Sequence, residues 1–461
     1  MPNSFVFDAN RCTGCDACRL ACSIENELGP DRSWRRVETF NPRRYPSAPL
    51  FHLSLACNHC DEPACMYACP ALAYSRDAAT GAVLLDESKC IGCRYCAWAC
   101  PYDAPVFEEA LGVMSKCTFC NHRLNKGAKP ACAVHCPTGA LDFADLPEEQ
   151  LVDGIEGFPQ TELGPRIQIR PLVAGRRLPV MTAAPAVHPV AATEHSQTGI
   201  SLKSEWSLML FTSAAAALVA VVAASVKTAL TLNPVAFSGA AAATLGLATL
   251  HLGRLERAHR AILNVKRSWL SREVVTLSSF LALGTFYLVL GPSAVALGVA
   301  ATLVGFLGLV CADQVYSVLK SSTPAYRHSA SALWTGFYLA GVFSGTFWLA
   351  AVFGFGKLGL YVLRKLEFID AGRPVRPALT AARTGLGLLL PPLLWLIDFQ
   401  ALFPAIVASA IIGELIDRSE YYEELESESP RREMDSALRA YVGNGDSRLR
   451  QRAVGRGDGM T

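Results

Sequence analysis

The sequence has no excess of charge of either sign. Its 461 residues include 42 lysines and arginines against 40 aspartates and glutamates, a formal net charge of +2. This balance argues against a nucleic-acid-binding protein, which would carry a concentrated basic surface. The first residues, MPNSFVFDANRC, have neither the basic nor the apolar region of a secretory signal peptide. We therefore expect the N-terminal part to fold as a soluble domain on the cytoplasmic side, without a nucleic-acid partner.

Cysteine and long apolar runs are present, but in different parts of the chain. Residues 1–200 contain about half of the charged residues and all but one of the 17 cysteines, whereas residues 206–416 contain nearly all the long apolar runs. A chain of this length also exceeds one ordinary domain. The sequence therefore predicts at least two parts of different character.

The cysteines of the first part fall into four groups of four. These are Cys12, Cys15, Cys18 and Cys22; Cys57, Cys60, Cys65 and Cys69; Cys90, Cys93, Cys96 and Cys100; and Cys117, Cys120, Cys132 and Cys136. A disulfide scaffold fits poorly, because cysteines three residues apart do not generally pair and no export signal is present. Structural zinc uses C-x2-C pairs but has no need for a third cysteine at the same spacing. The third group matches C-x2-C-x2-C-x3-C-P, a run that ligates iron–sulfur clusters.

In such a run three thiolates hold one cluster and the fourth reaches a neighbouring cluster. Groups two and three lie about twenty residues apart, as in a two-cluster ferredoxin, so we expect them to exchange their fourth ligands. Groups one and four would then form a second ferredoxin-like unit around the first. The predicted [4Fe–4S] ligands are Cys12, Cys15, Cys18 and Cys136 for cluster 1; Cys22, Cys117, Cys120 and Cys132 for cluster 2; Cys57, Cys60, Cys65 and Cys100 for cluster 3; and Cys69, Cys90, Cys93 and Cys96 for cluster 4. We thus predict an α+β, double-ferredoxin-like head over residues 1–172.

The apolar runs reach the length of a bilayer crossing, for which about twenty residues are needed. Seven crossings are expected at residues 206–226, 228–252, two within 274–312 on either side of Gly291 and Pro292, 329–356, 378–397 and 399–416. The basic segment 357–368 is short for an eighth crossing and is expected to be interfacial or a partial span. A soluble helical protein would need charged faces, which these runs lack. The sequence therefore predicts an all-α bundle of transmembrane helices over residues 205–418.

Two further segments flank this bundle. Residues 173–204, rich in proline and alanine, predict a linker, and residues 419–461 predict a largely disordered tail with at most a short helix. The loop 253–272 is the most basic, which favours the cytoplasmic side. Because two crossings precede it, we expect the head on the cytoplasmic side of a bacterial inner membrane. The basic residues of 357–376 oppose this orientation if there are only seven crossings.

Two ionisable residues at the ends of crossings are candidates for a quinone site. His251 ends the second crossing on the side of the head, where an imidazole could accept a proton from a quinol. Glu414 lies near the end of the seventh crossing, where a buried acid is costly and usually functional; the alternative is a structural ion pair with Arg418. Cys311, alone in the fourth crossing, is expected to be a small buried apolar residue. No pair of histidines is placed in the crossings to ligate a haem, so no haem is expected.

Several segments resemble known proteins. RCTGCDACRLAC, SLACNHCDEPACMYACP, CIGCRYCAWACPYDAP and KPACAVHCPTGALDF closely resemble the four-cluster electron-transfer subunit of the dimethyl sulfoxide reductase family, over residues 5 to about 172. TLHLGRLERAHRAILNVKRSWLSREV, VYSVLKSSTPAYRHS and GELIDRSEYY resemble the membrane anchor subunit of the same enzymes, over residues 206–422. The chain is therefore similar to a natural fusion of two subunits that are usually separate. The family's anchor usually has eight spans, against the seven counted here.

The resemblance has implications for partners and ligands. It implies a separate catalytic subunit that holds a molybdenum–pterin cofactor, since no such domain is present in this chain. It also implies that cysteine groups one and four face that partner, and that groups two and three face the membrane. His251, in the family's HLG motif, is implied to belong to the quinol site. Cys93, where nitrate-reductase relatives have tryptophan, implies four irons in its cluster.

The resulting hypothesis is an electron-transfer and quinone-reactive subunit of a membrane-bound molybdoenzyme of anaerobic respiration. Electrons would pass between a quinone such as menaquinone and the partner subunit, and the chain itself would perform no substrate chemistry. The same wiring could run in the oxidative direction, for example from sulfite to the quinone pool, because cluster potentials depend on their surroundings. The remaining alternative is a membrane transporter or sensor that uses the cysteines as a metal-binding module.

Overall fold

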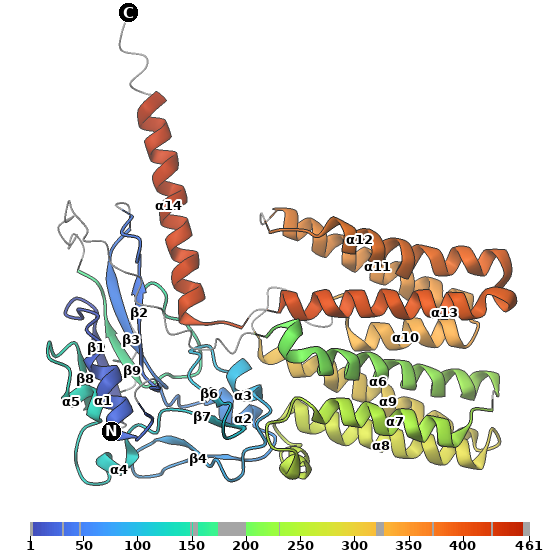
Figure 1. Ribbon diagram of the computed structural model, residues 1–461, viewed down its shortest axis with the longest axis horizontal. Coiled ribbons are helices and arrows are strands. Elements are labelled where there is room, and N and C mark those ends of the chain that lie inside the picture. Colours follow the sequence, from blue (N-terminus) through green and yellow to red (C-terminus); the bar gives the residue numbers. More distant parts are fainter. Residues whose placement is uncertain are drawn as a thin grey trace, which may run out of the picture.

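A computed structural model shows the head and the helical bundle side by side (Figure 1). The residues that it describes are 3–29, 32–45, 48–147, 150, 155–173, 200–229, 231–319, 327–370, 373–425 and 427–454, with side chains up to residue 442. Most of the predicted linker, residues 174–199, lies outside this part of the chain. The predicted fold class, a small α+β head followed by a helical membrane region, is confirmed.

A three-stranded sheet ties the two ends of the head together. Strand β1 (Asn3–Asp8) pairs in antiparallel register with β8 (Leu141–Asp145) and in parallel register with β9 (Ile167–Arg170). Phe5 lies opposite both Phe143 and Ile167 in this register. The sheet thus joins the first strand to strands that follow the last cysteine group, as an outer unit wrapped around an inner one requires.

The remaining strands form three antiparallel hairpins. They are β2 (Arg36–Phe40) with β3 (Phe51–Leu55), β4 (Tyr74–Arg76) with β5 (Val83–Leu85), and β6 (Val106–Glu108) with β7 (Val113–Ser115). Between them lie five short helices: α1 (Ala17–Glu25), α2 (Ala64–Ala68), α3 (Tyr95–Trp98), α4 (Asn121–Leu124) and α5 (Ala131–Val134). Each helix begins within or directly after a cysteine group, so the regular structure of the head serves mainly to position thiols.

The membrane region consists of apolar helices that run side by side (Figure 1). They are α6 (Leu202–Thr228), α7 (Pro234–Thr249), α8 (Trp269–Leu290), α9 (Val295–Val315), α10 (Ala332–Phe343), α11 (Phe347–Asp370) and a long segment formed by α12 (Pro377–Ala382), the π-helix η5 (Arg383–Leu389) and α13 (Leu390–Glu424). Short 3-10 helices, η2 (Leu255–Ile262) and η3 (Tyr316–Val318), lie in or at the connections. Five helices in the described part of the chain are long and apolar enough to cross a membrane, and α7 and α10 are shorter apolar helices. The protein is a multi-pass membrane protein.

The expected fifth crossing, 329–356, is not one helix. The chain leaves α10 after Phe343, turns at Gly345 with φ of +62°, and enters α11. Residues 357–368, expected to be interfacial, are the second half of α11. The long segment 377–424 is kinked at Asp398, where φ is −161°, and the chain reverses there (Figure 1). The described residues therefore contain eight apolar helical segments, one more than the predicted seven.

The predicted disordered tail also differs from the structure. Helix α13 continues past the expected boundary at residue 418 to Glu424, and α14 spans Pro430–Val454. Met434 is only 4% exposed and belongs to the core of the head. Tyr441 donates a hydrogen bond of 2.5 Å to Glu156 Oε1, and its ring lies 6.2 Å from that of Phe40. A stripe of apolar residues in an otherwise polar sequence explains this helix: it is stabilised by packing on the head.

Candidate metal centres and their contact with the membrane region

The thiols of predicted cluster 3 surround one cavity. Its lining includes Cys57, Cys60, Cys65 and Cys100, together with apolar neighbours such as Pro63 and Leu163. Burial raises the pKa of the Cys60 thiol, and the charges of Cys57, Cys100 and Cys65 raise it further. Four thiols that oppose one another's ionisation need a positive centre between them before all can ligate as thiolates. The residues present therefore fit a metal cluster in this cavity.

The thiols of predicted cluster 4 also lie together. Burial raises the pKa of the Cys96 thiol, and the charges of Cys93, Cys69 and Cys90 do the same, against a hydrogen bond from Tyr74 that lowers it. Backbone amides point at two of these sulfurs: Gly92 N and Met114 N each lie 3.4 Å from Cys90 Sγ, and Ala73 N lies 3.5 Å from Cys69 Sγ. Amide donors aimed at sulfur stabilise the anionic form and tune a bound cluster.

The structure brings together the thiols of the two other predicted sets as well. Burial raises the pKa of Cys12 to about 11, with contributions from the charges of Cys18, Cys136 and Cys15. Burial likewise raises the pKa of Cys120, and the charges of Cys132 and Cys22 add to this. The pKa of Cys117, the remaining thiol of cluster 2, is also raised by burial and then by the charge of Cys22. All 17 cysteines of the chain, Cys311 included, are free of disulfide bonds in the structure.

A shared backbone feature positions the second thiol of each group. The residue before that thiol has positive φ in all four groups: Gly14 (+70°), His59 (+45°), Gly92 (+70°) and Phe119 (+63°). A left-handed residue turns the chain sharply, so that consecutive thiols point to a common centre. Two of the four are glycine, and His59 and Phe119 instead stack on each other with centroids 4.0 Å apart. The turn is therefore a property of the C-x2-C spacing and not of glycine alone.

The loop between α7 and α8 lies directly on the cluster 4 ligands. Gly253 packs so closely on Gly112 that a Cβ at position 253 would clash with the Gly112 backbone, and a Cβ at Gly92 would clash with the backbones of both Gly112 and Gly253. Arg257 Nη1 donates to the carbonyl of Cys90 at 3.1 Å, and Asn264 Nδ2 donates to the carbonyl of Cys69 at 2.9 Å. The membrane region thus donates hydrogen bonds to the backbone of two predicted cluster 4 ligands, and this thiol set lies beside the bundle.

His251 stands at the start of this loop, two residues before Gly253. Its Nδ1 atom is buried and makes no hydrogen bond of regular geometry with the described residues, although the backbone of Ala248 approaches the ring. An imidazole nitrogen in this state is available for a ligand that enters between the loop and the bundle. The sequence-predicted histidine is therefore close to the cluster 4 thiols.

A glutamate that the sequence reasoning missed acts on Tyr95, a neighbour of the cluster 4 ligands, and is itself acted on by Arg418 and Asp313. Glu273, in the first turns of α8, is only 5% exposed. Burial raises the pKa of the Tyr95 phenol, and the charges of Glu273 and Cys93 raise it further, so Tyr95 stands between this acid and a predicted cluster ligand. Its hydroxyl donates to the carbonyl of Val315 at 2.9 Å. The available signal was an acid directly before an apolar run, since acids at membrane depth are costly and usually functional.

Glu414 does not share this site. Helix α7, which precedes His251, packs on α6 and α8, whereas α13 packs on α6, α10, α11 and α12. Glu414 lies 2.9 Å from both Lys357 Nζ and Arg383 Nη2, and it accepts a hydrogen bond from Thr335 at 2.6 Å. The alternative pairing with Arg418 is not formed, because Arg418 approaches Asp313 at 3.9 Å instead.

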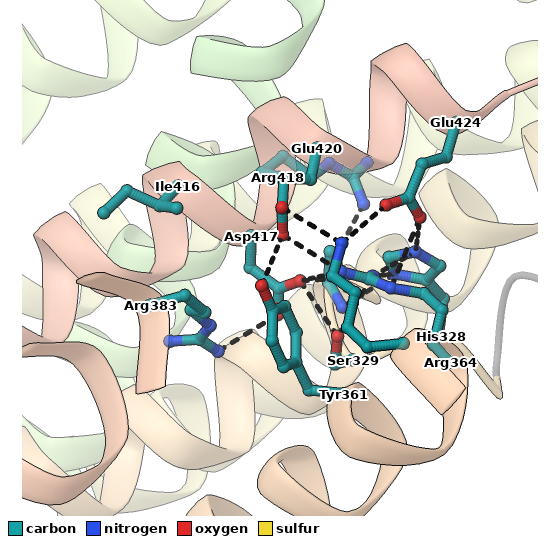
Figure 2. A network of polar contacts seen from close by, with 12 residues as sticks. His328, Ser329, Tyr361, Arg364, Arg383, Ile416, Asp417, Arg418, Glu420 and Glu424 are labelled. Carbon is teal, nitrogen blue, oxygen red and sulfur yellow. Dashed lines mark hydrogen bonds and ion pairs between the residues drawn. The ribbon is translucent and has the colours of Figure 1, made fainter. Parts of the chain in front are cut away.

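These contacts belong to a larger buried ion network of α11, η5 and α13, which Figure 2 shows from close by. Its members are the cations Lys357, Arg364, Lys365 and Arg383 and the acids Glu414, Asp417, Glu420 and Glu424. Asp417, fully buried, lies 3.0 Å from Arg383 and 3.3 Å from Arg364. Four cations and four acids balance each other, which explains how the basic half of α11 can lie inside an apolar bundle.

Two family models match the chain. One, described as a 4Fe-4S dicluster domain, covers residues 49–146, and the other, described as the DMSO reductase anchor subunit (DmsC), covers residues 202–381.

Similar proteins of known name match part of the chain. An anaerobic dimethyl sulfoxide reductase polypeptide of Haemophilus influenzae is 38% identical over 181 residues, 36% of this chain and 88% of that protein. Its Escherichia coli counterpart is 42% identical over 152 residues, 31% of this chain and 74% of that protein. A sulfite dehydrogenase subunit of Allochromatium vinosum is 36% identical over 164 residues, 31% of this chain and 68% of that protein.

Proposed function

Because this protein belongs to the family of dimethyl sulfoxide reductase iron–sulfur subunits and carries a DmsC-type anchor in the same polypeptide, we propose that it transfers electrons between the membrane and a separate molybdenum-containing catalytic subunit. The observation that carries this proposal is the pair of hydrogen bonds that the α7–α8 loop donates to the backbone carbonyls of Cys69 and Cys90. A thiol set held against a membrane bundle is suited to exchange electrons with a carrier dissolved in the lipid. The other thiol sets then lead away from the membrane.

In this proposal the head holds four [4Fe–4S] clusters, with the sixteen ligands assigned from the sequence. When bound, such clusters supply one-electron transfer without proton chemistry. The chain contributes the thiolates and the amide donors at Cys69 and Cys90, and it buries all four predicted ligands of cluster 4. These protein groups thereby tune the reduction potentials of the clusters.

The membrane carrier in this proposal is a quinone, bound between the α7–α8 loop and the head-side ends of α7 and α8. Quinol oxidation releases two electrons and two protons, so the site needs proton acceptors. His251 Nδ1 accepts one proton from the quinol hydroxyl, and Glu273 is placed to receive or pass on a proton beside Tyr95. In this proposal Glu273 takes the place of Glu414, which the sequence offered as a second candidate for the quinone site.

The catalytic partner is proposed to bind where α1 and α5 meet. Leu20 and Ile24 of α1 are 57% and 70% exposed, and Val134 of α5 is 52% exposed. Exposed apolar side chains that lie together mark interaction surfaces. Cys18 and Cys22 are on the buried side of α1, so a partner on this face would stand beside clusters 1 and 2.

The head is proposed to lie on the cytoplasmic side of the inner membrane. With eight helical segments, the basic residues at the end of α11 fall on the same side as the basic loop 253–272. This removes the conflict that seven crossings created for the positive-inside rule. The direction of electron flow follows the partner, since relatives include both a reductase and a sulfite dehydrogenase subunit.

The test is metal analysis of the anaerobically purified protein. Four clusters correspond to about sixteen irons per chain, with reversible electron paramagnetic resonance signals on reduction. Reduction of these signals by added menaquinol would support the membrane role. Stoichiometric zinc, or a preparation without signals in either redox state, would contradict the proposal.

A further inference from the structure

One buried cation of the head is not explained by protein contacts. Arg35 is only 1% exposed, and its guanidinium carbon lies 4.4 Å above the ring of Phe5. Its Nη1 atom donates to the carbonyl and the hydroxyl of Ser54 at 3.2 and 3.1 Å. Its Nε and Nη2 atoms are buried and reach no nitrogen or oxygen partner among the described residues, and the side chain approaches the thiol of Cys132 instead. A buried guanidinium with so few polar contacts is costly unless an anion compensates it.

The groups that act on Arg35 are cluster thiols. Burial lowers the pKa of the guanidinium, but the charges of Cys132, Cys18, Cys117 and Cys22 raise it, and the net direction is upward. Three of these four are predicted ligands of cluster 2, and Cys18 is a predicted ligand of cluster 1. The compensating anion is therefore the metal cluster that these thiols would hold, since an iron–sulfur cluster with four thiolates is negatively charged.

We propose that Arg35 sets the reduction potential of cluster 2, and to a smaller extent that of cluster 1, by placing a fixed positive charge beside them. The inference rests on the proposed function, because it needs the clusters to be present. A cation stabilises the form of the cluster that carries one more electron, so Arg35 raises the potential. No bond forms or breaks in this step, and the electron comes from the neighbouring cluster.

A second buried cation provides an internal comparison. Lys116 is 3% exposed, and its Nζ lies 3.6 Å from Cys57 Sγ and 2.9 Å from the carbonyl of Cys117. The sulfur that it contacts belongs to predicted cluster 3. The charge of Lys116 also acts on Cys117 of predicted cluster 2, so Lys116 should act on clusters 3 and 2, whereas Arg35 should act on clusters 2 and 1.

The experiment is a redox titration of the full chain, followed by electron paramagnetic resonance, for Arg35→Met and Arg35→Lys. Arg35→Met should lower the midpoint potential of one cluster by at least about 59 mV. For one electron, this shift corresponds to a tenfold change in the reduction equilibrium constant. Arg35→Lys, which keeps the charge, should retain most of the original potential. Lys116→Met should shift the signal of cluster 3, which Arg35→Met should leave unchanged. Arg36→Gln is the matched control, because it also removes one positive charge, from the next residue along the chain. The guanidinium of Arg36 already pairs with the carboxylates of Glu38 and Asp103, so its loss should leave the cluster potentials unchanged.

Unchanged potentials in Arg35→Met with full iron content would overturn the proposal, as would an equal shift in Arg36→Gln. If Arg35→Met binds less iron, Arg35→Gln keeps a donor for Ser54 and is titrated instead. Iron loss in both neutral variants with full iron in Arg35→Lys would support charge compensation, whereas iron loss in all three would refute it. Failure of the proposed function is distinct, because the unmodified protein would then show no cluster signals.

Discussion

The head and the membrane bundle both bury charge, but they compensate it in different ways. In the bundle, Lys357, Arg364, Lys365 and Arg383 face Glu414, Asp417, Glu420 and Glu424, so protein groups alone complete the balance. In the head, the charges nearest to Arg35 are thiols. The comparison teaches that this ion network of the bundle is balanced by protein groups, whereas Arg35 in the head has only thiols as its nearest charges.

Removal of a cluster ligand should break the head and leave the bundle intact. Cys96→Ala should lose up to about four irons per chain and abolish reduction by quinol, because the thiol set beside the membrane is incomplete. Iron analysis and electron paramagnetic resonance measure the loss. Cys311→Ala is the control, since this cysteine lies buried in α9 away from the four groups; if it lost as much iron as Cys96→Ala, the ligand assignment would be wrong.

The opposite experiment breaks the bundle and spares the head. Asp417→Asn leaves Arg364 and Arg383 without a shared anion, and loss of one partner from a buried pair costs about 3–5 kcal/mol. Thermal unfolding of the bundle in detergent should therefore occur at lower temperature, with unchanged iron content. Arg376→Gln breaks the exposed pair with Glu423, in which Arg376 is 61% exposed, and should cost at most about 1 kcal/mol. Equal effects of the two variants would argue that the network contributes nothing specific.

The junction between the two regions is tested at His251. His251→Ala should slow quinol oxidation by about a hundredfold, the lower range for loss of a general base, while every cluster signal persists. Stopped-flow reduction by menaquinol measures this rate. His259→Ala, an exposed histidine of the same loop, should react at the normal rate. An unchanged rate in His251→Ala would remove this residue from the proposed quinol site.

The smallest expected effect is at the contact of α14 with the head. Tyr441→Phe removes one hydrogen bond to Glu156 and should lower the free energy of unfolding of the head by about 1 kcal/mol. Chemical denaturation followed by loss of cluster absorbance measures it. Deletion of residues 430–461 should lower stability further, because Met434 also leaves the core. A deletion variant as stable as the full chain would show that α14 does not support the head.

Much of the fold and of the candidate site could be predicted from local patterns. The C-x2-C spacings led to four thiol sets, and the structure brings each set together around the turns at Gly14, His59, Gly92 and Phe119. The apolar runs located most of the helices in the same way. Both signals depend on residues that are near one another in the chain.

The errors arose where residues distant in the chain decide the outcome. Residues 357–368 were expected to be interfacial or a partial span because their charges were counted alone, while their partners lie about sixty residues later on α13. Glu414, one of the two candidates for the quinone site, is part of that same balance, and Glu273, whose charge acts on Tyr95, was not singled out from the sequence. The tail was predicted to be disordered because the surface that covers Met434 and Tyr441 belongs to the head.

By itself, the sequence determined the chemistry of the head and the apolar character of the bundle, because ligand type, ligand spacing and hydrophobicity are local properties. Only the tertiary structure decided which charges neutralise each other and which thiol set lies against the helical bundle. It also decided which buried acid acts on Tyr95 near that thiol set. The physical reason is that the cost of burying a charge depends on its neighbours in space. Those neighbours come from helices and loops that the linear order of residues keeps apart.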